Sequence, residues 1–240
     1  GNYKNVKILM MNESTKIATK VLKSVHLNAN SIEKFELMGS LRRYEVFSSF
    51  LLPLTNITHL TITHFFPEEE DQEIFDKNPH FTEIHLPNLK YLEVYNSIKF
   101  YPLLKTHQIT TLKAFEERRF LPMLYLNTAN YQQEFNRLFR GFIKFLKSCN
   151  LLTYLYLDSI KYTEIFTEKN YPFKLEKGSF ICDGLEEELL IMFLKPHKET
   201  LKSLTVNVQP TSKIILFALN DLELSHFDVD LYNTPVDQFK

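Results

Sequence analysis

A short pattern of apolar positions occurs four times between Leu152 and Val229. Each copy places two apolar residues three positions apart and a third apolar residue two positions further on. The four copies are Leu152, Leu155 and Leu157; Leu175, Gly178 and Phe180; Leu201, Leu204 and Val206; and Leu224, Phe227 and Val229. Their starts are separated by 23, 26 and 23 residues. A nearly fixed period in this range, opening with L-x-x-L-x-L, is typical of leucine-rich repeats.

The end of each copy predicts an extended strand. Successive side chains of a strand point to opposite faces, so Leu155 and Leu157 point to one face while Tyr154 and Tyr156 point to the other. One such strand cannot bury its apolar face alone, but copies stacked in a parallel sheet can, and the chain returns between strands as helix or loop. Because helices are wider than strands, the stack curves. The sequence therefore predicts an α/β leucine-rich-repeat solenoid, a horseshoe with parallel strands on the concave face and helices on the convex face.

The same pattern recurs with looser spacing earlier in the chain. The earlier copies are Tyr3, Val6 and Ile8; Ile32, Phe35 and Leu37; Ile57, Leu60 and Ile62; Leu89, Leu92 and Val94; and Ile109, Leu112 and Ala114. We therefore predict a single domain over residues 1–240 with eight or nine irregular repeats. Between Leu112 and Leu155 the period stretches to 43 residues, which predicts an insertion near residues 115–130.

Several segments between the copies have helical spacing, and two of them predict helices clearly. From Tyr131 to Cys149 an apolar stripe faces one way and a basic stripe the other, which predicts an amphipathic helix with Asn130 as its N-cap. A second helix is expected over residues 184–195, with Asp183 as its cap and acidic residues in its first turn. Both helices return the chain from one strand to the next.

Three stretches carry a family resemblance: residues 86–94, 150–157 and 193–206. They resemble the irregular, helix-containing leucine-rich repeats of F-box proteins, especially the divergent insect kind. The resemblance implies the substrate-recognition arm of a cullin-RING ubiquitin ligase, in which an F-box binds the adaptor and the repeats hold the substrate. Residues 1–11 already match a repeat strand, so the F-box and its adaptor contact are expected to lie outside this chain.

Composition excludes several classes of partner. Lys and Arg number 28 against 29 Asp and Glu, so the chain has no net attraction for nucleic acids or anionic membranes. No apolar run approaches the roughly 20 residues of a membrane span. We therefore expect neither a nucleic-acid nor a membrane partner. Two cysteines, Cys149 and Cys182, suit a reduced intracellular protein, so a cytoplasmic or nuclear location is expected.

Catalytic and metal-binding signals are weak. The chain has five glycines and none of the glycine-rich nucleotide-binding or nucleophile motifs. His59 with His64, and His80 with His85, stand five residues apart without a third ligand. We therefore predict no enzymatic activity, no metal and no cofactor. An acidic run over residues 67–73 is interpreted as the solvated start of a helix, or alternatively as a contact for a basic partner.

The solvent-facing strand positions are the candidate site. Aromatic residues at these positions occur on consecutive repeats and are expected to lie side by side. Tyrosine anchors protein interfaces because it buries a large area and keeps a hydroxyl for hydrogen bonding, although tyrosine also simply suits strands. The predicted partner-binding residues are Tyr91, Glu93, Tyr95, Lys113, Phe115, Tyr154, Tyr156, His226 and Asp228.

The leading functional hypothesis is a protein–protein interaction module that holds a partner on its concave face, with the substrate receptor of a ubiquitin ligase as its specific form. One alternative is a secreted repeat protein of the immune or venom type, which a bond between Cys149 and Cys182 or a glycan on Asn56 would support. Another is an enzyme whose site lies in the insertion near residues 115–130 and among the His and Asp residues at the rim, which a bound metal or a closed polar pocket there would support.

Overall fold

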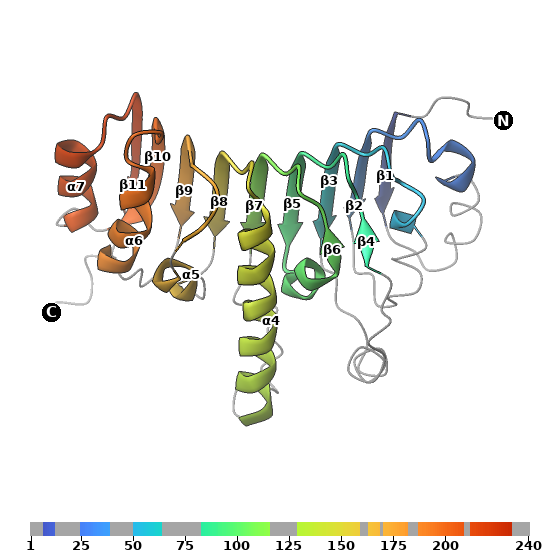
Figure 1. Ribbon diagram of the computed structural model, residues 1–240, viewed down its shortest axis with the longest axis horizontal. Coiled ribbons are helices and arrows are strands. Elements are labelled where there is room, and N and C mark those ends of the chain that lie inside the picture. The colour runs from blue at the N-terminus through green and yellow to red at the C-terminus, as the bar shows by residue number, and fades with distance from the viewer. Residues whose placement is uncertain are drawn as a thin grey trace, which may run out of the picture. The chain divides into compact units, whose positions relative to one another are not determined.

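The chain forms two compact units, Gly1–Leu152 and Thr153–Lys240 (Figure 1). Each unit combines parallel strands with helices and is therefore of the α/β class. The computed structural model describes residues 7–12, 25–38, 50–63, 83–115, 129–158, 163–168, 170–181, 187–208 and 212–231. The prediction of one domain over residues 1–240 stays a prediction.

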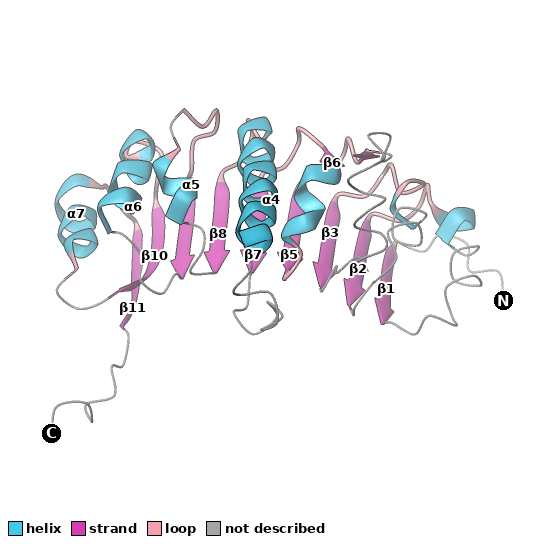
Figure 2. Ribbon diagram, turned by 90° about the horizontal axis from the view of Figure 1, so that it is seen from below, coloured by secondary structure: helices cyan, strands magenta, loops and turns pink. Residues whose placement is uncertain are grey.

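The first unit contains a sheet of parallel strands with helices on one side. Strand order follows chain order, and the strands are β1 (Ile8–Asn12), β2 (Lys34–Met38), β3 (His59–Thr63), β5 (Tyr91–Tyr95) and β7 (Thr111–Phe115). A separate parallel pair is formed by β4 (Ile84–His85) and β6 (Leu104–Lys105). The 3-10 helix η1 (Ile98–Leu103) and helix α4 (Ala129–Ser148) lie on the same side of the sheet (Figure 2).

The second unit repeats this plan. Its parallel strands are β8 (Tyr154–Asp158), β9 (Lys177–Ile181), β10 (Ser203–Val208) and β11 (His226–Leu231). Its helices are α5 (Thr163–Thr167), α6 (Glu187–Leu194), the 3-10 helix η5 (Lys195–His197) and α7 (Lys213–Asp221). Figure 2 shows α5, α6 and α7 on one side of the strands.

The strand register of the second unit confirms the predicted stacking. Leu155 pairs with Gly178, Gly178 with Leu204, and Leu204 with Phe227, each time in a parallel ladder. These are the middle positions of the four copies that the pattern aligns. The apolar residues of the copies that begin at Ile32, Ile57, Leu89 and Ile109 are buried as well, at 0 to 2% exposure.

Of the first predicted copy, Tyr3 and Val6 lie outside the described residues, and the inward position given to Ile8 is wrong. Ile8 was expected to point inward, but its side chain is 58% exposed and its strand partner is Lys34. The inward partner of Phe35 is Leu9. Two registers fit the sequence equally well in this segment, because apolar residues occur at both spacings. The hydrogen bonds to β2 select between them, and spacing alone does not.

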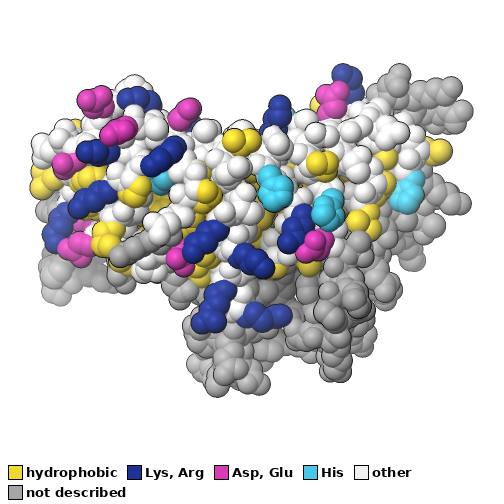
Figure 3. Space-filling view, viewed as in Figure 1, with side chains coloured by type: hydrophobic (Ala, Val, Ile, Leu, Met, Phe, Trp, Pro, Cys, Tyr) yellow, Lys and Arg dark blue, Asp and Glu magenta, His cyan; other side chains and the backbone are white. Residues whose placement is uncertain are grey.

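Helix α4 confirms the long helix predicted after residue 130, but it includes Asn130, which is therefore not its N-cap. Close packing of α4 on η1 depends on Gly141, since a Cβ there would stand 2.5 Å from Cγ of Pro102. Figure 3 views the side that carries α4 and shows Lys and Arg side chains gathered over it. Their exposed members on α4 are Arg137, Arg140, Lys144 and Lys147.

The other predicted segments are described in part. Of the insertion expected near residues 115–130, residues 129 and 130 begin α4, and residues 116–128 lie outside the described residues. Helix α6 confirms the second predicted helix, while Asp183 lies outside the described residues. The acidic run over residues 67–73 also lies outside them.

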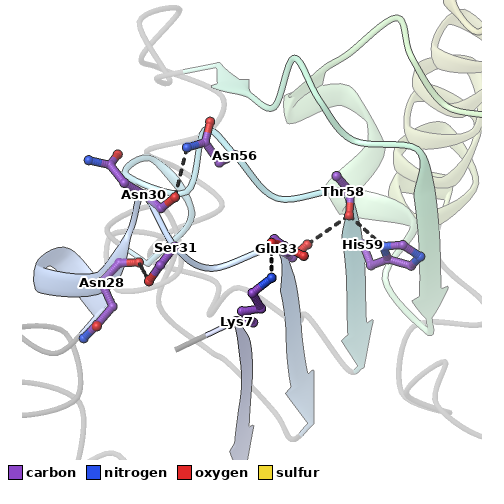
Figure 4. Close-up of polar contacts among 8 residues, drawn as sticks. All are labelled: Lys7, Asn28, Asn30, Ser31, Glu33, Asn56, Thr58 and His59. Atoms are coloured by element: carbon purple, nitrogen blue, oxygen red, sulfur yellow. Dashed lines mark hydrogen bonds and ion pairs between the residues drawn. The ribbon is translucent and has the colours of Figure 1, made fainter. Parts of the chain in front are cut away.

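Within each unit, a repeated pair of backbone hydrogen bonds joins the starts of neighbouring strands. The carbonyl of Glu33 accepts two successive backbone N–H groups, from Thr58 at 2.8 Å and His59 at 3.2 Å. The Thr58 hydroxyl donates to the same carbonyl at 3.2 Å, and Lys7 forms a 3.1 Å ion pair with the Glu33 side chain (Figure 4). The same pair of hydrogen bonds recurs at the carbonyls of Lys7, Thr58, Lys90, Thr153, Glu176 and Lys202. Backbone N–H groups at the start of a strand need acceptors, so these paired hydrogen bonds fix the spacing between neighbouring repeats.

One copy carries glycine where the others carry a large apolar residue. A Cβ on Gly178 would stand 2.6 Å from Cε2 of Phe180, so the ring of Phe180 fills the space that a leucine would occupy. The same ring packs edge-to-face against Phe166 and Phe193, with centroids 5.7 and 5.9 Å apart. An aromatic cluster thus replaces part of the aliphatic core in the second unit.

Candidate functional site

In each unit the face of the sheet opposite the helices carries half-exposed side chains. On β5 the burial alternates, with Leu92 and Val94 buried and Tyr91, Glu93 and Tyr95 half-buried on the other side. We call this side the open face of each unit. It is the face on which the sequence predicted a partner-binding site.

A carboxylate organises the open face of the first unit. The side chain of Glu93 is only 14% exposed and lies between two tyrosines of its own strand. The Tyr91 hydroxyl donates to Oε2 and the Tyr95 hydroxyl donates to Oε1. Nζ of Lys113, the neighbour of Glu93 on β7, stands 3.7 Å from Oε2. A largely buried carboxylate is stable only with such partners, so these side chains hold one another in place.

Ring contacts extend this arrangement across three strands. Tyr95 stacks on Phe115 with centroids 4.1 Å apart and planes 9° apart, and His59 stacks on Tyr91 at 5.4 Å. Nζ of Lys113 lies 5.5 Å from the centroid of the Tyr91 ring. The strand register sets His59 opposite Tyr91 and Tyr95 opposite Phe115, while Lys113 is opposite Glu93 and reaches the Tyr91 ring diagonally. We call the set of His59, Tyr91, Glu93, Tyr95, Lys113 and Phe115 the Glu93 cluster.

The Tyr95 hydroxyl stays protonated in this setting. Burial raises its pKa above the ordinary value near 10, and the hydrogen bond to Glu93 raises the pKa further. The hydroxyl proton therefore stays in the hydrogen bond to the Glu93 carboxylate. The sequence predicts tyrosine hydroxyls that are available to a partner, whereas in the structure two of them donate to Glu93.

The second unit places its predicted residues in two separate positions. Tyr154 and Tyr156 are half-exposed on β8. Nζ of Lys177 lies 4.8 Å from the Tyr154 centroid, and the Tyr156 hydroxyl donates to Asp158 at 3.3 Å. The predicted residues His226 and Asp228 are exposed on β11, which is separated from β8 by β9 and β10. The structure therefore does not bring these two pairs into contact.

Part of the predicted site is therefore assembled and part stays a prediction. Tyr91, Glu93, Tyr95, Lys113 and Phe115 lie together in the first unit. The expectation that they continue side by side with the tyrosines of β8 spans both units and stays a prediction. The predicted set omitted His59 and Lys177, although both occupy solvent-facing positions. Only the register, which pairs them with Tyr91 and Tyr154, shows their contacts.

Two features bear on the alternative functions. Cys149 is a fully buried free thiol, whereas Cys182, its partner in the disulfide that would support a secreted protein, lies outside the described residues. Sγ of Cys149 donates to the carbonyl of Phe145 at 3.3 Å, and burial raises the pKa of the thiol to about 12. Asn56 is exposed, and its side chain donates to the carbonyl of Asn30 at 3.1 Å.

Neither metal nor membrane contacts are indicated where the chain is described. In those ranges no three His, Cys, Asp or Glu side chains gather closely enough to share a metal ion. His64 and His80 lie outside the described residues. No helix in the described ranges combines the length and the apolar character that a bilayer-spanning segment needs.

A partly open cavity of about 320 Å³ lies beside the β4–β6 pair. It is lined by His85, Pro87, Lys105, Thr106, His107 and Gln108. Glu83 forms a 3.0 Å ion pair with Lys105 and stands 3.8 Å from Nε2 of His85. The enzyme hypothesis placed its site near residues 115–130, and residues 116–128 lie outside the described residues, so this cavity does not test it.

Comparison of the chain with protein-family models, curated proteins and solved structures finds no match. The geometry of the open faces is therefore the basis for a functional proposal.

Proposed function

We propose that this chain is a leucine-rich-repeat module that binds a protein partner on the open face of its sheets. The observation that carries the proposal is the Glu93 cluster. Its aromatic side chains are half-exposed, yet contacts with one another and with a common carboxylate hold them in place. Side chains that are already ordered lose little conformational entropy when a partner covers them, which favours binding. Tyrosines of this kind are enriched among the residues that dominate interface energies.

Strand propensity is the competing explanation for these residues. Propensity accounts for tyrosine in a strand, but it gives no reason to place a carboxylate between two of them at 14% exposure. Desolvating that carboxylate costs stability, which its hydrogen bonds and Lys113 must offset. An arrangement that is costly to build and that leaves aromatic rings accessible supports a binding role.

The horseshoe is part of the same proposal. Two features support one continuous solenoid with the open faces on its concave side. Parallel strands are backed by helices in each unit, and the same pair of backbone hydrogen bonds recurs between neighbouring strands of each unit. The resemblance to F-box repeat proteins further supports a substrate held on that side. In this form of the proposal an F-box outside this chain binds the ubiquitin-ligase adaptor.

The binding role is tested by removing one aromatic anchor from each unit. We expect Tyr91→Ala combined with Tyr154→Ala to lower partner affinity at least tenfold, because truncating each interface anchor typically costs more than about 1 kcal/mol. The partner is identified by cross-linking to the full chain, and affinity is measured by calorimetric titration. Lys144→Ala on the exposed side of α4 is the matched control. Circular dichroism should show both variants folded, and unchanged affinity of the double variant would contradict the proposal.

The ligase role requires its own experiment. The protein with its native flanking sequence, purified from cells, should bring the adaptor and a cullin with it. A partner captured through the open face without adaptor or cullin would contradict the substrate-receptor role and leave the binding role standing.

A further inference from the structure

The direction of the hydrogen bonds in the Glu93 cluster determines whether a hydrogen-bond donor or an acceptor of a partner can bind there. A phenol has one proton, and the Tyr95 hydroxyl gives its proton to Oε1 of Glu93. Tyr91 gives its proton to Oε2 of the same carboxylate. Toward a partner, the Tyr95 oxygen therefore acts only as an acceptor. A carboxylate or carbonyl of the partner would find no phenolic proton here, whereas an N–H donor would find an acceptor.

The rings of the open faces favour cations as well. A phenol that donates to a carboxylate is polarised toward greater electron density, which strengthens the attraction of its ring for positive charge. The molecule already makes this contact twice, with Lys113 at 5.5 Å from the Tyr91 centroid and Lys177 at 4.8 Å from the Tyr154 centroid. Cations are thus stable against the tyrosine rings of both units.

The Tyr95–Phe115 stack offers a flat surface for a further cation. The two rings are nearly parallel at 4.1 Å, so one face of each ring covers the other. On the other neighbouring strand, β3, the registered partner of Tyr95 is the small residue Thr63. A planar group can lie against the other face of the Tyr95 ring and reach the Tyr95 oxygen at its edge.

Resting on the proposed function, we propose that the partner presents an arginine side chain to the Tyr95 ring. The guanidinium stacks on the ring and donates an N–H to the Tyr95 hydroxyl oxygen. Arginine fits better than lysine because its group is planar, carries five donors and is weakly hydrated.

Charge on this face does not by itself attract the arginine from a distance. Lys113 is balanced by Glu93, and Lys34 forms a 2.7 Å ion pair with Glu36. The described ion pairs of this open face therefore sum to no net charge. Recognition is consequently short-ranged, and we expect it to depend only weakly on salt.

The test uses four blocked pentapeptides that differ at one central residue: arginine, citrulline, lysine or glutamate, each flanked by glycines. Binding to the full chain is followed by nuclear magnetic resonance, with the ring signals of Tyr95 and Phe115 as reporters. The arginine peptide should bind about two- to fivefold more tightly than the uncharged citrulline peptide, the range expected for an exposed cation–ring contact. It should also bind more tightly than the lysine peptide, because the planar guanidinium can stack on the ring and donate to the Tyr95 oxygen at the same time. The glutamate peptide should leave the reporters unchanged. Equal or tighter binding of the glutamate peptide would overturn the inference, as would arginine binding that does not perturb Tyr95.

Three variants separate this contact from a merely structural effect. Tyr95→Phe keeps the ring and removes the acceptor oxygen, so it should lower arginine affinity about two- to fivefold. Glu93→Gln can donate to one phenol and leaves Lys113 unbalanced, so the preference should move from arginine toward glutamate. Lys144→Ala should change nothing. If Glu93→Gln leaves the preference for arginine intact, the hydrogen-bond argument is wrong.

Two further results distinguish failure of the arginine inference from failure of the proposed binding function. A captured protein partner that is lost with Tyr95→Ala, but retained after its arginines are blocked with phenylglyoxal, would overturn this inference alone. A partner that binds Tyr95→Ala and the double variant of Tyr91 and Tyr154 as well as the unmodified chain would overturn the proposed function.

Discussion

The buried side chain of His197 makes the unfolding free energy of the second unit depend on pH. This side chain is 2% exposed, and its Nδ1 accepts the backbone N–H of Leu175 at 3.3 Å. The imidazole stacks on Phe173 at 5.7 Å and meets Phe193 edge-on at 5.4 Å. Burial, and secondarily the positive charge of Lys174, lowers the pKa of His197 from 6.5 to about 4. The folded state therefore holds this side chain neutral.

The sign and size of the effect follow from that shift. The unfolded chain binds the proton more readily than the folded chain, so the stabilisation is complete above the unfolded pKa of 6.5 and is lost as pH falls toward 4. Each unit of pKa difference corresponds to about 1.4 kcal/mol. The loss from this group alone should therefore be about 2 kcal/mol at pH 5, and about 3 kcal/mol by pH 4.

The assay is urea unfolding followed by far-ultraviolet circular dichroism at pH 7.5, 6 and 5. His197→Asn keeps an acceptor oxygen near the position of Nδ1 and removes the titration. Between pH 7.5 and 5 the unmodified chain should lose about 2 kcal/mol more unfolding free energy than His197→Asn. His226→Asn, at an exposed position on β11, is the matched control and should retain the steeper dependence. Parallel pH dependences for the unmodified chain and His197→Asn would refute the reasoning.

Two further predictions concern buried positions. Gly178→Leu restores the repeat pattern but forces a side chain into the space of the Phe180 ring, so it should lower the unfolding free energy by about 1 to 3 kcal/mol. Adding Phe180→Leu should recover part of that loss in the same urea assay, and a stabilising single substitution would contradict the packing argument. Cys149, in a Cys182→Ser background, should react with a thiol reagent at pH 8 only after urea unfolding, because burial raises its pKa to about 12. Rapid labelling of the native chain would show that the thiol is accessible.

The strands were predictable because their signal is local. Alternation of buried and exposed positions is a property of the strand itself, so Leu60 and Ile62, for example, could be assigned to the inner face before any contact was known. The same logic failed for Ile8, where two registers satisfied the spacing. The choice between registers depends on hydrogen bonds to a strand more than 20 residues away, and no local pattern contains them.

The candidate site was predictable only in outline. Spacing assigned Tyr91, Glu93 and Tyr95 to one face, but it could not show that both hydroxyls donate to the carboxylate. His59 looked like half of a weak metal pair and instead stacks on Tyr91. Contacts between strands depend on which residues the register sets opposite one another. Because the repeats differ in length, this register cannot be derived from their spacing in the sequence.

The sequence by itself determined the period of the chain, the inner face of most strands and the places of its two clearest helices, because each follows from the geometry of one segment. Only the tertiary structure decided the first strand's register, the glycine beneath Phe180 and the inward direction of the tyrosine hydroxyls. Each of these depends on contacts between residues of different repeats or positions, and tertiary packing decides which residues meet.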